Sequence, residues 1–323
     1  METLRRNTEA YLAKPDVSDK IDEIVDILCR NRATDLTLYS ACYASTPETV
    51  EEEMDPLFRE RKVTSSLFTG RGDILQKLNR VFEPRARGSK PRRDFLLWGI
   101  AGIGKTQIAL RFVDLFAERF DKVLWIDASS VQMIHHSFEV IASDILEHPG
   151  QAPHIRPVLN WLDTTKEEWL LIIDNYDSGN ITRYLPSKRK GNILFTSRRS
   201  IFEPQLPPGS MLEVSEMSMS DSARLFLKAC GMDEEDEDLR EQAYPIVKEL
   251  AMLPLALDTA GAQIYMGGQT FDRFLANVRK ERGQVLAEAP PGSEGSRNPS
   301  VYATFELSLK SIKAYSLKVL RRK

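Results

Sequence analysis

The chain has 323 residues, of which 42% are hydrophobic and 28% charged, and its net charge is -3. This balance is that of a globular protein, and the length suggests about two domains. The weakly acidic charge argues against a nucleic-acid scaffold, and no apolar stretch approaches the roughly 20 residues of a bilayer-spanning helix. We therefore expect a cytoplasmic protein with no nucleic-acid partner and no membrane partner. The three cysteines are odd in number and widely spaced, which predicts neither a disulfide framework nor a zinc site.

The N-terminal segment, residues 1–62, contains one strongly amphipathic helix pattern. Ile21, Ile24, Val25 and Leu28 share one face of this helix. The segment is short for an enzymatic effector domain. Two interpretations stay open: a helical extension that packs on the rest of the chain, or a helix that binds a partner.

A glycine-rich turn separates an apolar run from an amphipathic one. Residues 94–99 read as a short buried strand, and residues 107–120 carry apolar side chains at helical spacing. Between them lies G-x-x-x-x-G-K-T, a pattern whose backbone N–H groups approach phosphates closely at a helix N-terminus. In this pattern Lys105 reaches the β- and γ-phosphates, and the Thr106 hydroxyl is a ligand of Mg²⁺. The predicted nucleotide-binding residues of the turn are Gly99, Gly102, Ile103, Gly104, Lys105, Thr106 and Gln107.

A second buried strand ends in a carboxylate that suits this metal. Residues 169–173 form a continuous apolar run followed by Asp174, which we expect to hold Mg²⁺ through water as a catalytic residue. The next residue is Asn175, which cannot accept a proton, so fast hydrolysis is not expected. Asp177 is the nearest alternative base, although an acid in a loop is more often simply solvated.

Three further apolar runs complete a predicted sheet. Residues 122–126, 192–196 and 211–214 read as strands, and helical patterns alternate with them. The alternation predicts an α/β fold, a doubly wound parallel sheet of five strands with its ligand at the carboxyl ends of the strands. Arg198 follows one strand at this edge, where it would feel the γ-phosphate as a catalytic residue; a surface ion pair is the alternative.

The part of the chain after the sheet has a different pattern. We place the nucleotide-binding domain at residues 63–215, and residues 216–285 read as several short helices, which predicts a small all-helical domain. Residues 286–300 are rich in Pro, Gly and Ser and read as a linker. A helical pattern opens again in residues 301–323.

Five motifs, in this order, resemble the nucleotide-binding module of NB-ARC proteins, in the STAND class of P-loop NTPases. The resemblance covers about residues 63–315, and it implies an ATP/ADP switch with Mg²⁺ that controls assembly in signalling. It also implies that Phe68, Gly70 and Arg71 lie beside the adenine and ribose, that Arg198 is the sensor arginine and that Pro254 touches the adenine. The motifs are Phe68-Thr69-Gly70-Arg71, GIAGIGKT, LLIIDN, FTSR and Met252-Leu253-Pro254-Leu255-Ala256.

The resemblance also predicts where the chain departs from its family. Relatives continue into a full winged-helix domain and a repeat array, whereas residues 301–323 match the start of a winged-helix region, which we expect to be truncated. We predict an ATP/ADP-binding switch with slow or absent hydrolysis, whose other partners are proteins or further copies of itself. The alternatives are an active AAA-like ATPase and a truncated fragment that no longer signals.

Overall fold

The computed structural model describes residues 63–84, 91–146, 154–177, 180–188, 190–200 and 206–287. The chain divides into two compact units. One comprises Thr64–Lys248 and Met252–Gly261, and the other comprises Met1–Val63, Glu249–Ala251 and Ala262–Lys323. The predicted N-terminal extension and winged-helix start lie outside the described residues, as does the predicted linker after its first two residues.

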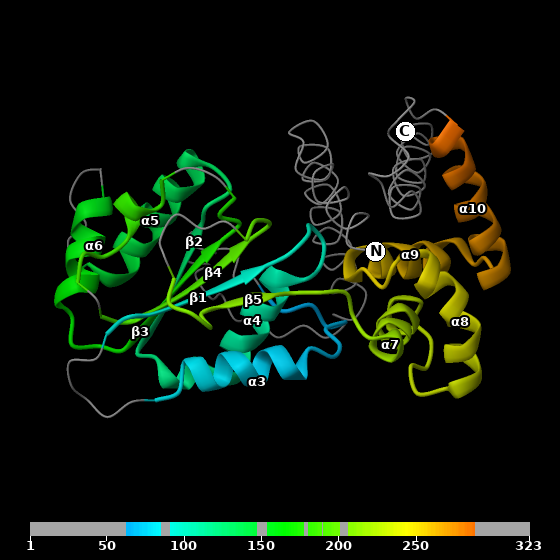
Figure 1. Cartoon of the computed structure of the whole chain (residues 1–323), viewed down its shortest axis with the longest axis horizontal. Coiled ribbons are helices and arrows are strands. Elements are labelled where there is room, and N and C mark those ends of the chain that lie inside the picture. Colours follow the sequence, from blue (N-terminus) through cyan, green and yellow to red (C-terminus); the bar gives the residue numbers. More distant parts are fainter. Residues whose placement is uncertain are drawn as a thin grey trace, which may run out of the picture. The chain divides into compact units, whose positions relative to one another are not determined.

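The first unit is built on a five-stranded sheet (Figure 1). Its strands are β1 (Arg93–Trp98), β2 (Lys122–Asp127), β3 (Trp169–Asp174), β4 (Asn192–Ser197) and β5 (Met211–Glu213). Their order is β2-β3-β4-β1-β5, and every neighbouring pair is parallel. The α/β fold with a five-stranded parallel sheet is therefore confirmed, and each predicted strand agrees with the observed one to within one residue at either end.

The strand register gathers polar residues at one edge. Asp127 is paired with Asp174 across β2 and β3, and Trp98 is paired with Ser197 across β1 and β4. The carboxyl ends of these four parallel strands therefore lie at the same edge of the sheet, where ligands bind in folds of this kind.

Helices connect the strands and cover both faces. Before β1 comes α3 (Gly72–Val81), which packs against α4 (Lys105–Phe116); the 3-10 turn η1 (Ala117–Arg119) extends α4. On the other face α5 (Val131–Ile145) packs on β2 and on α6 (Ile155–Thr164), and η2 (Thr182–Tyr184) precedes β4. Figure 1 shows α3 and α4 on one side of the sheet and α5 and α6 on the other.

Two of these helices were missing from the sequence prediction. In α3 the buried residues Ile74, Leu75 and Leu78 lie at helical spacing, yet the helix starts without a capping side chain. In α6 a proline, Pro157, occupies the first turn, where the missing N–H has no helical partner to lose. The proline reads as a breaker in the sequence, although at this position it is compatible with a helix.

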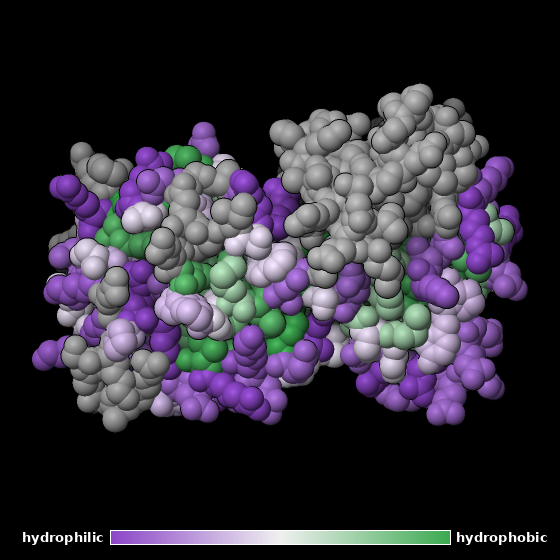
Figure 2. All heavy atoms as spheres, in the orientation of Figure 1, coloured by the Kyte–Doolittle hydropathy of each residue, from purple (hydrophilic) through white to green (hydrophobic). Residues whose placement is uncertain are grey.

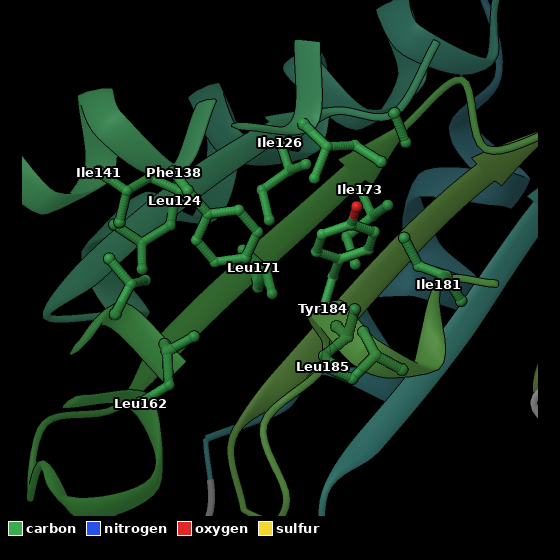
Figure 3. Close-up of a cluster of buried hydrophobic side chains, with 14 of the residues drawn as sticks. Leu124, Ile126, Phe138, Ile141, Leu162, Leu171, Ile173, Ile181, Tyr184 and Leu185 are labelled. Atoms are coloured by element: carbon green, nitrogen blue, oxygen red, sulfur yellow. The ribbon is translucent and has the colours of Figure 1, made fainter. Parts of the chain in front are cut away.

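Two apolar layers enclose the sheet. Every residue of β3 is buried, and because side chains alternate along a strand, Leu171 and Ile173 face one layer while Leu170 and Ile172 face the other. On the first of these faces Phe138 of α5 packs among the strand residues (Figure 3). This packing fixes the end of β3, which carries the predicted metal ligand.

Every described element after β5 is a helix, as predicted. These are α7 (Met219–Ala229), α8 (Glu237–Glu249), α9 (Pro254–Gly267) and α10 (Phe271–Ala287). Ser218 caps α7 by accepting a hydrogen bond of 3.0 Å from the backbone N of Asp221. In the first unit, α9 approaches α7 closely at Gly261, where an added Cβ would lie 2.4 Å from the Cβ of Ala229.

No helix in the described part of the chain is long and apolar enough to span a membrane. Hydrophilic residues predominate among the coloured residues on the face drawn in Figure 2. The cytoplasmic location remains a prediction.

Candidate nucleotide-binding site

The glycine-rich turn joins β1 to α4, and two of its positions combine a positive φ with a close neighbour that disfavours a side chain. At Gly99, with a φ of 153°, a Cβ would lie 2.6 Å from the backbone oxygen of Val214. At Gly102, with a φ of 75°, a Cβ would lie 3.1 Å from the Cβ of Leu255. Both positions therefore need glycine. The turn leads directly into Lys105, the first residue of α4, so the positive end of the helix dipole lies at the turn.

Lys105 is buried at the start of α4. Its Nζ donates hydrogen bonds to the backbone oxygens of Gly99 at 2.8 Å and of Ile100 at 3.0 Å. Burial lowers the pKa of Lys105 to about 8; the neighbouring Asp177 opposes this shift and Arg198 adds to it. An anion in the turn would stabilise the charged ammonium, and a phosphate group is an anion of suitable geometry.

Asp174 ends β3 and is fully buried, and it is bonded to two neighbouring elements. Its Oδ1 accepts hydrogen bonds from Thr106 Oγ1 of α4 at 2.8 Å and from Thr196 Oγ1 of β4 at 2.6 Å. Carboxylate and hydroxyl oxygens are the hard ligands that Mg²⁺ prefers, so these residues fit the metal.

The described residues also indicate how such a metal would be held. Within the described ranges, no three or more His, Cys, Asp and Glu side chains gather as a metal site. Mg²⁺ commonly keeps several waters and binds through one or two carboxylates together with substrate phosphates. The pair of Thr106 and Asp174 fits this mode, in which the nucleotide supplies the remaining ligands.

The turn after β3 places an amide directly beside this carboxylate. Asn175 has a φ of 62°, and its backbone N donates a hydrogen bond of 2.9 Å to Thr196 Oγ1. Asp177, the alternative base, forms an ion pair with Arg198. Arg198 thus makes the ion pair that the sequence left open, and its charge also acts on Lys105, whose pKa it lowers.

The segment predicted to lie beside adenine and ribose is anchored by Arg71. The Arg71 guanidinium donates to the backbone oxygens of Ile103 in the turn, at 3.1 Å, and of Ser215 after β5, at 2.7 Å. Burial lowers the pKa of Arg71. Phe68 lies next to α4, with the Arg111 guanidinium 5.9 Å from the centroid of its ring.

The Leu-Pro-Leu-Ala motif meets the turn within the same compact unit. The backbone N of Leu255 donates a hydrogen bond of 3.2 Å to the backbone oxygen of Gly102. A Cβ added at Gly104 would lie 4.0 Å from Cγ of Pro254, so the predicted adenine contact borders the turn. Gln107 is engaged elsewhere, because its Oε1 accepts a hydrogen bond of 2.8 Å from the backbone N of Ser65.

Two contributions to the site were missed by sequence reasoning. Thr196, the last residue of the predicted strand 192–196, was given no role in the sequence analysis, yet it shares Asp174 with Thr106. The sequence signal that could have indicated this role is a threonine at the end of one apolar strand, when another predicted strand ends in an aspartate. The second is the carbonyl bonding of Arg71, which depends on tertiary structure and has no local signal.

Comparison with known proteins gives one curated relative, and no protein-family model matches the chain. A nucleotide-binding leucine-rich repeat (NLR)-like protein of Hyaloscypha variabilis is 28% identical over 235 residues. The match covers 65% of this chain and 23% of the relative, so the chain spans about a quarter of that protein's length.

Several solved structures are also similar. A STAND protein with a tetratricopeptide repeat sensor from Pyrococcus horikoshii has a TM-score of 0.43 and 18% identity, over 72% of this chain and 36% of that one. Cdc6p from Pyrobaculum aerophilum has a TM-score of 0.49 and 13% identity, over 71% and 73% of the two chains. The Aeropyrum pernix Orc1 protein, solved in complex with DNA, has a TM-score of 0.47 and 16% identity, over 71% and 70%.

These comparisons correct one prediction. We excluded a nucleic-acid partner on the ground of net charge, and that exclusion is wrong. The similar structures include Orc1 in complex with DNA, the replication initiator DnaA bound to single-stranded DNA, and Drosophila ORC bound to DNA. The net charge of a whole chain does not describe one face of it, so a value of -3 excludes no such partner.

The sheet order, the phosphate turn and the curated relative agree with one another. A glycine-rich turn joins β1 to a helix that begins with Lys105 and Thr106, and Thr106 contacts Asp174 at the buried end of β3. The relative's name describes a nucleotide-binding protein. The chain has the α/β fold and the phosphate-turn motif of a P-loop NTPase, and it is similar to an NLR-like protein over 65% of its length.

Proposed function

We propose that the chain binds ATP and ADP with Mg²⁺ and acts as a nucleotide-dependent switch that hydrolyses ATP slowly or not at all. The observation that carries this proposal is the shared oxygen of Asp174, which ties Thr106 of the phosphate turn to the end of β3 and to Thr196 of β4. This arrangement joins the predicted metal ligands before any ligand is bound.

Each residue of the turn has a role in the proposal. The backbone N–H groups from Gly99 to Gly104 and the dipole of α4 bind the phosphates, and Lys105 exchanges its two carbonyl partners for phosphate oxygens. Thr106 and Asp174 would hold Mg²⁺, Asp174 through water, and the bound metal would supply positive charge that stabilises the β- and γ-phosphates.

Slow hydrolysis follows from the groups beside the proposed phosphate position. The Asn175 amide cannot accept a proton from water. Asp177 has a carboxylate that already accepts hydrogen bonds from Ser197 and Arg198. Neither residue is therefore suited to activate a water molecule.

The nucleoside end of the proposed site is formed by two segments that already contact the turn. Phe68, Gly70 and Arg71 would lie beside adenine and ribose, and Pro254 would cover the adenine. In support, Arg71 and Leu255 each hydrogen-bond the backbone of the turn. We keep residues 63–215 as the proposed nucleotide-binding domain and 216–285 as the proposed helical domain.

Calorimetric titration of the purified chain with ADP and with Mg²⁺ plus a non-hydrolysable ATP analogue tests the proposal. We expect both nucleotides to bind, and Lys105→Ala to abolish binding because it removes the buried ammonium. Lys248→Ala, which removes an exposed lysine of α8, is the matched control and should bind as the wild type does. Unchanged affinity in Lys105→Ala, or no binding by the wild type, would overturn the proposed function.

A further inference from the structure

The carboxylate of Asp177 links the turn after β3 to the end of β4. Its Oδ1 accepts hydrogen bonds from the backbone N of Arg198 at 2.5 Å and from Ser197 Oγ at 3.2 Å. Its Oδ2 accepts from Nε of the same Arg198. One carboxylate therefore binds both the backbone and the side chain of a single arginine.

This double attachment restricts the arginine. A bond at Nε holds the side of the guanidinium nearest the aliphatic stem, and the backbone bond fixes the residue from which that stem starts. The rotamer freedom of a long side chain is thus reduced before any ligand binds. Arg198 is 28% exposed and Asp177 is 19% exposed, so the pair is partly shielded from solvent, which strengthens its electrostatic attraction.

The pair also lies at the phosphate turn. The backbone N of Gly99, the first glycine of the turn, donates a hydrogen bond of 3.2 Å to the backbone oxygen of Ser197, the residue before Arg198. Ser197, which shares the Asp177 oxygen, ends β4 opposite Trp98, the last residue of β1 before the turn. Asp177 is thus placed to act on the phosphate site through Arg198.

We propose that Asp177 is a positioning residue that orients the Arg198 guanidinium toward the γ-phosphate, so that the Asp177–Arg198 pair sets the preference of the site for ATP over ADP. This inference rests on the proposed function. ADP lacks the γ-phosphate, so a change in the pair alters binding of ATP and leaves binding of ADP as it was. A guanidinium held in place loses less freedom on meeting the phosphate, which favours the triphosphate.

The test is the ratio of ATP-analogue affinity to ADP affinity in four proteins: wild type, Asp177→Asn, Arg198→Ala and the double variant. We expect Asp177→Asn to lower this ratio roughly tenfold, the effect of weakening one charge-assisted hydrogen bond, with ADP affinity unchanged. Arg198→Ala should lower the ratio at least as much. The double variant should match Arg198→Ala, because Asp177 acts through Arg198.

Asp163 supplies a matched control. Its carboxylate also accepts three hydrogen bonds, from Ser187 N at 3.1 Å, from Ser187 Oγ at 2.6 Å and from Lys188 N at 2.7 Å. Asp163 lies near the end of α6, and Ser187 and Lys188 precede β4, so these groups lie at the amino ends of the strands, away from the phosphate turn. Asp163→Asn should leave the ATP:ADP ratio unchanged.

Each other outcome is decisive. An equal loss of ATP and ADP affinity in Asp177→Asn would mean that Asp177 is merely structural. A rise in the ATP:ADP affinity ratio would mean that Asp177 competes with the phosphate for Arg198. Either result overturns the inference. If the wild type binds neither nucleotide, the proposed function itself has failed. If Asp177→Asn does not fold, Arg198→Lys is the replacement variant. Lysine still brings a positive charge to the phosphate, but it lacks the Nε–H group that binds Asp177. An unchanged ATP:ADP ratio in Arg198→Lys would overturn the inference.

Discussion

Thr106 and Asp174 are joined by a hydrogen bond of 2.8 Å between the first turn of α4 and the buried end of β3. The bond connects the two proposed metal ligands across 68 positions of sequence. The two oxygens therefore occupy defined positions before a metal binds.

Removal of this carboxylate should affect the triphosphate more than the diphosphate. Asp174→Ala leaves the Thr106 and Thr196 hydroxyls without their acceptor, which should cost about 1 to 3 kcal/mol of stability. Because Mg²⁺ held at Asp174 would neutralise charge on the γ-phosphate, which ADP lacks, Mg²⁺-dependent binding of an ATP analogue should weaken more than binding of ADP. Titrations with Mg²⁺ and with EDTA measure this difference, and an equal loss for both nucleotides would show that Asp174 is structural.

Lys105→Met should stabilise the nucleotide-free chain while it abolishes binding. Burial lowers the pKa of Lys105 from 10.5 to about 8, so holding this charge costs the folded state about 3 kcal/mol at neutral pH. The two carbonyls left without a donor offset part of the gain, and we expect a net gain of about 1 to 2 kcal/mol at pH 7.

The pH dependence of that gain identifies its origin. Between pH 8 and 10.5 the unfolded chain binds a proton at Lys105 that the folded chain has released, so wild-type stability rises relative to the variant across this range. The advantage of Lys105→Met should therefore shrink as the pH rises above 8. Denaturant unfolding at pH 7 and pH 9.5, with Lys248→Met as control, measures it; a pH-independent difference contradicts the assignment.

Arg71→Lys should weaken ATP and ADP binding in equal proportion. The guanidinium bridges the backbone oxygens of Ile103 and Ser215, and one ammonium lacks the fork that serves both at these distances. The turn then loses a support on which both nucleotides depend. Parallel titrations check this, and a change confined to ATP would place Arg71 with Arg198 at the γ-phosphate instead.

The bend before α9 stores backbone strain that glycine should relieve. Ala251 has a φ of 53°, a left-handed conformation that costs an alanine about 1 to 2 kcal/mol. Glycine also raises the conformational entropy of the unfolded chain, which offsets part of this gain. Ala251→Gly should therefore stabilise the chain by about 0.5 to 1 kcal/mol. Ala276→Gly, in the exposed interior of α10, should instead destabilise it by about 1 kcal/mol. Thermal unfolding followed by circular dichroism should show opposite signs for the two variants.

The sheet and the phosphate turn could be predicted because their signals are local. Each strand is a short apolar run, and the turn is a fixed spacing of glycines followed by Lys105 and Thr106. The carboxylate at the end of β3 could be predicted for the same reason, since parallel strands carry their ligands at one edge.

The remaining features depend on contacts between segments far apart in the chain. Asp177 read as a solvated loop acid, because nothing near it in sequence shows that Arg198 will bind both of its oxygens. Arg71 read as a ligand residue, because its partners, Ile103 and Ser215, are 32 and 144 positions away. Composition likewise gave no basis for excluding nucleic acid.

The turnover of bound ATP tests the central claim most directly. In a single-turnover experiment with radiolabelled ATP, a slow switch should retain ATP and hydrolyse it far below the rate of about 10 s⁻¹ that is ordinary for enzymes. Asn175→Asp, which supplies a carboxylate beside Asp174, should raise the rate, since general-base catalysis contributes about 10² to 10⁴-fold. Wild-type turnover near 10 s⁻¹ would contradict the account and indicate an active ATPase with another base.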